Sequence, residues 1–95
     1  MEDKKGFVSK LNEAIVGHIP NVEKVEYECY RHRLGKWKQE YVVVHYKGGE
    51  WACRCVNGTS CHGIYHSIAK LLNGGYYEEN DDRLSYIRNE GWVLE

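Results

Sequence analysis

With 95 residues and 42% apolar side chains, the chain can build one modest core, and we expect residues 1–95 to form a single small domain. A formal net charge of −1 excludes the global basic field that many nucleic-acid-binding proteins carry. No apolar run approaches the roughly 20 residues that a membrane-spanning helix needs, so no membrane association is expected.

Residues 4–17 are predicted to form the first helix. Apolar side chains recur with a helical period from Phe7 to Ile15, and lysines occupy much of the remaining surface. Gly17 can end this helix, and Pro20 prevents its continuation.

Three β-strands are predicted next. Residues 22–31 alternate between apolar and charged side chains, which indicates a half-buried strand with its charged face toward water. Cys29 falls on the apolar face, where a small core residue with an inert thiol is expected. Residues 37–46 are apolar on both faces and indicate a central strand, in which His45 is expected to be a cross-strand polar residue rather than a ligand. Residues 51–56 follow a Gly-Gly hairpin turn as the third strand.

A second helix is expected from about Cys61 or His62 to Leu72, capped by a preceding threonine or serine. Residues 74–80 then form an internal flexible linker before a short helix at 81–89. The α-β-β-β-α-α order predicts an α+β fold in which helices pack on a three-stranded antiparallel meander.

The cysteines gather where the third strand meets the second helix. The N-terminal segment lacks an apolar signal core, so we expect a cytoplasmic protein whose thiols stay reduced, which favours metal over disulfides. Alternation places both thiols of the C-x-C on one side of the strand, and a helix N-terminus stabilises a thiolate. Three cysteines and one histidine fill a closed zinc site. The expected zinc ligands are Cys53, Cys55, Cys61 and His66, with His62 as the alternative fourth ligand. The other interpretation is that the C-x-C thiols are ordinary buried residues without a metal.

This pattern resembles the SWIM-type zinc finger over residues 41–72. That family has C-x-C, a spacer and C-x-H on a strand–strand–helix framework, and here Trp51 precedes the C-x-C as aromatic residues often do in the family. The chain departs from it in placing four residues, rather than one, between Cys61 and His66. The resemblance implies zinc binding by Cys53, Cys55, Cys61 and His66, and DNA or protein binding within larger assemblies rather than catalysis.

A local basic segment, YRHRLGKWK at residues 30–38, connects the first two strands. Basic side chains interleaved with aromatic rings can contact phosphates while the rings stack on bases. The alternative is the solvated end of a hairpin. The candidate nucleic-acid or partner-binding residues are Arg31, Arg33, Lys36, Trp37 and Lys38.

We therefore expect a small zinc-binding module that mediates nucleic-acid or protein interaction. The alternative is a metal-free α+β domain with a protein-interaction or regulatory role, because helix–meander–helix is also the order of double-stranded RNA-binding domains. That family would have a basic cluster at the start of its second helix, where this chain has Cys61-His62-Gly63. Catalysis by Cys61 with His62 or His66 is not expected, because no separate base and orienting group can be named, and no small-molecule substrate is inferred.

Overall fold

The computed structural model describes residues 3–73, 78–79 and 82–95. In this part of the chain the helices are α1 (Lys4–Val16), α2 (Cys61–Asn73) and α3 (Asp82–Asn89). The strands are β1 (Val22–Arg31), β2 (Lys38–Tyr46), β3 (Trp51–Cys55), β4 (Glu78–Glu79) and β5 (Val93–Leu94). The predicted α+β class and element order are confirmed, with two short strands added. The expected linker at 74–80 lies outside the described residues except for 78–79, which form β4.

The strands form one antiparallel sheet in the order β4-β3-β2-β1-β5. The predicted three-stranded meander, β1-β2-β3, is its centre, and the two-residue strands extend it at both edges. The turn between β2 and β3 places Gly49 at φ +90°, a conformation that glycine adopts without the steric cost of a Cβ atom.

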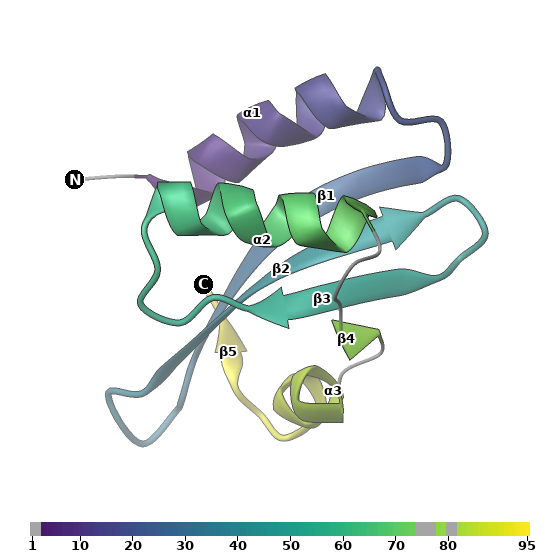
Figure 1. Cartoon of the computed structure of the whole chain (residues 1–95). Helices are drawn as coiled ribbons and strands as arrows, with labels where there is room; N and C mark the ends of the chain where they lie inside the picture. The colour runs from purple at the N-terminus through teal and green to yellow at the C-terminus, as the bar shows by residue number, and fades with distance from the viewer. Residues whose placement is uncertain (1–2, 74–77, 80–81) are drawn as a thin grey trace.

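Helices cover both faces of the sheet, as Figure 1 shows. α1 and α2 lie side by side on one face, and α3 packs against the other. The core beneath α1 and α2 contains Val8, Val22, Val25, Val42, Val44, Ala52, Val56, Ile64, Ile68 and Leu71. The core beneath α3 contains Tyr30, Tyr41, Val43, Cys53, Leu84 and Ile87. Strand β2 supplies residues to both cores, which confirms the prediction of a central strand.

Local capping fixes where α1 and α2 begin. The Asp3 carboxylate accepts a hydrogen bond from the Gly6 N–H at 3.1 Å at the start of α1. At the start of α2 the Ser60 hydroxyl accepts from the Gly63 N–H at 3.4 Å. Both helices therefore begin at side-chain caps of the kind that the sequence indicated for α2.

The face of β1 that was expected to meet water is partly covered. Lys24 on this face is exposed as expected, but Glu28 is only 9% exposed, so the prediction that the charged face meets water is wrong at Glu28. The cause is α3, which comes from far along the chain and packs Leu84 and Ile87 onto the sheet here. Beyond α3, Trp92 packs against the same core.

Candidate functional site

The structure divides the four expected zinc ligands between the two faces of the sheet. Cys53 is fully buried in the core beneath α3, and Cys55 packs against that core. Cys61 begins α2 on the opposite face, where it lines a hollow with Phe7 of α1. His66 is exposed on the outer surface of α2.

The cause of this division is the face of the sheet to which each side chain of β3 points. Both C-x-C thiols point to the same side of the strand, but that side carries α3. Ala52 and Val56, which point the other way, belong to the core beneath α1 and α2. The ligand set Cys53, Cys55, Cys61 and His66 is therefore not brought together, and neither is the set with His62.

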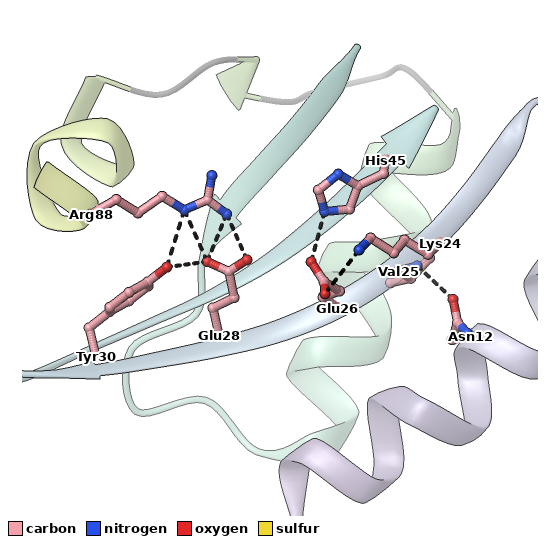
Figure 2. A network of polar contacts seen from close by, with 8 residues as sticks. All are labelled: Asn12, Lys24, Val25, Glu26, Glu28, Tyr30, His45 and Arg88. Atoms are coloured by element: carbon pink, nitrogen blue, oxygen red, sulfur yellow. Dashed lines mark hydrogen bonds and ion pairs between the residues drawn. The ribbon is translucent and has the colours of Figure 1, made fainter. Parts of the chain in front are cut away.

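A different group of potential metal ligands does converge. Within residues 3–73, 78–79 and 82–95, the ligand atoms of Glu26, Glu28 and His45 all lie within 4.8 Å of one another, so this cluster could hold a metal ion. Glu26 and Glu28 are two apart on β1 and share the α3 face, and His45 reaches them from β2. The His45 Nε2–H donates to Glu26 at 2.8 Å (Figure 2), so His45 is a cross-strand polar residue as expected, but its place in this cluster also makes it a potential ligand, which the sequence did not indicate.

Arg88 of α3 already supplies positive charge to this cluster. Its Nη2 lies 2.8 and 2.6 Å from the two carboxylate oxygens of Glu28, and its Nε donates to the Tyr30 hydroxyl at 3.1 Å (Figure 2). The Tyr30 hydroxyl in turn donates to Glu28. The guanidinium carbon also lies 5.4 Å from the centroid of the Trp51 ring, which is cation–π geometry. A metal ion in the cluster would have to share Glu28 with this guanidinium.

The surroundings of Glu26, Tyr30 and Arg88 shift the pKa of each of these side chains. Burial disfavours the Glu26 carboxylate, but the hydrogen bond from His45 and the charge of Lys24 outweigh it and lower the pKa of Glu26. Burial and the Glu28 carboxylate raise the pKa of Tyr30 to about 12, so its hydroxyl remains a donor at neutral pH. Burial opposes the charge on Arg88, yet Glu28 and Tyr30 raise its pKa above the ordinary value.

A second polar cluster surrounds Glu40 at the other face of the sheet. Its carboxylate accepts from Lys4 at 2.9 Å, from the Tyr27 hydroxyl at 2.5 Å and from the Gly58 N–H at 3.0 Å. Burial opposes ionisation, but these donors together lower the pKa of Glu40. The cluster thereby ties the start of α1 to the loop that precedes α2.

The loop between β1 and β2 presents the predicted basic segment, which we call the basic tip (residues 31–38). Arg31 pairs with Glu95 at 2.5 Å, and the Lys38 Nζ lies 3.9 Å from the same carboxylate. Arg33 and Lys36 are exposed and form no ion pair with any residue that the structure describes. Their charge therefore remains available to a partner.

Aromatic contacts hold the basic tip in one shape. The His32 ring lies between two indoles, with centroids 5.4 Å from Trp37 and 4.9 Å from Trp92. The Trp37 ring also lies across Gly35, where a Cβ atom would be 2.6 Å from the ring. Trp37 nevertheless remains 63% exposed, and Leu34 beside it is 89% exposed.

Comparisons with known proteins give no match: no family model fits the chain, and no curated protein or solved structure resembles it significantly. The SWIM resemblance therefore stays a prediction. The helices in the described ranges are all too short or too polar to cross a membrane.

The sequence patterns did not identify Glu28, Arg88 or Glu40 as members of the two polar clusters. One signal was present for Arg88, because Leu84 and Ile87 are three apart and predict an apolar helix face beside it. The partner of Arg88 lies 60 positions away, and no local pattern indicates it.

Proposed function

We propose that this chain is a binding module for nucleic acid with unpaired bases, and that the basic tip is its contact surface. The observation that carries the proposal is the combination, in one loop, of a Trp37 ring that is 63% exposed with two basic side chains that lack ion-pair partners among the described residues. Arg33 and Lys36 supply charge for phosphates, and an indole provides a stacking surface for a base.

The shape of the basic tip supports this function. The Leu34 N–H donates to Nδ1 of His32 at 3.1 Å, and the His32 N–H donates to the Trp37 carbonyl at 3.1 Å. A loop that is already ordered loses less conformational entropy on binding than a flexible one. The tip therefore presents its indole without a large ordering cost.

Neighbouring elements extend the surface. The starts of α1 and α2 and the basic tip all lie toward one end of the molecule, at the left in Figure 1. Asn57, just before α2, donates to Gln39 near the base of the tip at 3.0 Å. Lys5 and Lys10 are exposed on α1. A strand of nucleic acid that contacts the tip could thus continue along α1.

The test is fluorescence anisotropy of labelled single-stranded RNA and DNA, titrated at several salt concentrations. Arg33→Glu with Lys36→Glu should weaken binding and reduce the magnitude of the salt slope by about 1.4, for two phosphate contacts to a single strand. Lys47→Glu with Lys70→Glu changes the net charge equally at the opposite end of the molecule and is the matched control. It should leave the salt slope close to that of the wild type.

Stacking is tested separately with uncharged changes. Trp37→Ala should cost about 1–3 kcal/mol of binding free energy, the usual loss for one stacked base. Gly35→Ala keeps every charge but forces the Trp37 ring to move, and should weaken binding without lowering Tm appreciably. Failure of the wild type to bind any single strand, or equal losses in the tip and control variants, would overturn the proposal. Preference for duplex RNA with no effect of Trp37→Ala would also contradict it.

A further inference from the structure

Two histidines stand on the outer surface of α2 with their rings turned toward each other. His62 and His66 are four residues apart, so they occupy the same face on successive turns, and both are exposed. Their ring centroids lie 4.4 Å apart at an interplanar angle of 85°. The two Nε2 atoms are separated by 3.0 Å.

This separation matches the spacing of two nitrogen ligands on one metal ion. Zinc–nitrogen bonds of about 2.0–2.1 Å place two ligands about 2.9 Å apart at a right angle and about 3.3 Å apart at the tetrahedral angle. The observed 3.0 Å lies between these values. The helix places both histidines on one face, and in the observed side-chain conformations the two donors lie at chelating distance.

We propose that His62 and His66 together chelate one divalent transition-metal ion of the nickel, copper and zinc group, for which imidazole is a suitable donor. Both rings bind through Nε2 in the neutral form. The ring that donates its Nε2 proton to the other must shift that proton to Nδ1, so the rearrangement releases no proton. Water fills the remaining coordination positions. This site differs from the expected cysteine-rich one, in which His62 and His66 were alternatives for a single place.

The pair is a better candidate than the acidic cluster around Glu28. Arg88 occupies Glu28, whereas neither helix histidine forms an ion pair with a residue in the described ranges. The Tyr65 ring lies beside the His66 ring, with their centroids 5.7 Å apart, and Tyr65 is 51% exposed, so the site borders solvent. An ion could reach it without breaking a buried interaction.

The experiment is calorimetric titration of the tag-free chain with zinc chloride and, separately, nickel chloride. The wild type should bind one ion per chain at this site. His62→Ala and His66→Ala should each weaken that binding by at least about tenfold, because one donor arm is lost. Both positions are exposed, so circular dichroism should show the same helix content in all variants.

Two further variants make the result decisive. His62→Ala with Lys70→His restores the four-residue spacing one turn later on α2 and should recover ion binding, which a purely structural effect of His62 would not. Cys61→Ser should bind as the wild type does. The absence of binding by the wild type, no loss in either single histidine variant, or loss in Cys61→Ser would each overturn the proposal.

Discussion

Removing the Arg88 guanidinium should detach α3 from the sheet more strongly than its surface position suggests. In Arg88→Met the apolar part of the side chain is kept, but Glu28 loses contacts of 2.6 and 2.8 Å and retains only Tyr30 of the partners in Figure 2. Glu28, whose side chain is 11% exposed with Arg88 in place, would then lose the cation bonded to it.

The magnitude follows from how much water reaches the pair. Breaking a fully buried ion pair costs about 3–5 kcal/mol, because the remaining charge is left without compensation. Here the Arg88 side chain is 34% exposed, so solvent partly relieves Glu28, and we expect a loss of about 2–3 kcal/mol. For a domain of this size that lowers Tm by roughly 8–24 °C.

Urea unfolding and calorimetry of matched variants measure this loss. Arg31→Met is the control, because its pair with Glu95 joins side chains that are 50% and 35% exposed, so solvent screens the pair and its loss should change stability little. A double-mutant cycle with Glu28→Gln isolates the pairwise energy. The reasoning fails if Arg88→Met costs no more than Arg31→Met, or if Glu28→Gln and Arg88→Met are additive.

Three other outcomes are expected. The pKa values of Glu26 and Glu40 are lowered from 4.5 in the folded state. The stability that these ionised carboxylates add to the fold is therefore complete above pH 4.5 and is lost as the pH falls through their lowered pKa values. Glu40→Gln should therefore be less stable than the wild type at neutral pH, and its stability should fall less steeply as the pH is lowered, as measured by unfolding followed by circular dichroism. A pH profile identical to that of the wild type would contradict this. Leu84→Ala, at a side chain with 0% exposure, should cost about 2–5 kcal/mol in urea unfolding, whereas Leu94→Ala, at 58% exposure, should cost little; equal effects would refute the core assignment. Burial and the hydrogen bond to Glu95 raise the pKa of Cys29, so iodoacetamide should label it far more slowly than Cys61 when measured by mass spectrometry, and rapid labelling would show that the thiol is accessible.

The elements were predictable because their signals are local. The alternation in residues 22–31 and the helical spacing of Ile64, Ile68 and Leu71 each reflect the surface that one segment buries. The basic tip was also predictable, since a turn between two strands brings its own charges together. Its pairing with Glu95 was not, because β5 joins β1 only through contacts across the length of the chain.

The candidate site depended instead on which face of the sheet each helix covers. Both faces of the sheet are apolar along β2, so the pattern of residues 41–44 gives no preference for either one. Once α2 covers Val56, alternation turns Cys55 toward α3 and separates it from Cys61. Covering the second face with α3 also places Glu28 under a helix.

The two histidines of α2 follow from the same geometry. A zinc site shared between β3 and α2 requires donors that point into the layer between them, and the apolar stripe of α2 fills that layer with Ile64 and Ile68. His62 and His66 therefore point outward, where their rings face each other and Tyr65 packs against His66. The orientation of α2 that buries Ile64 and Ile68 thus directs His66 away from the cysteines. The same orientation leaves the His66 Nε2 atom 3.0 Å from the Nε2 atom of His62.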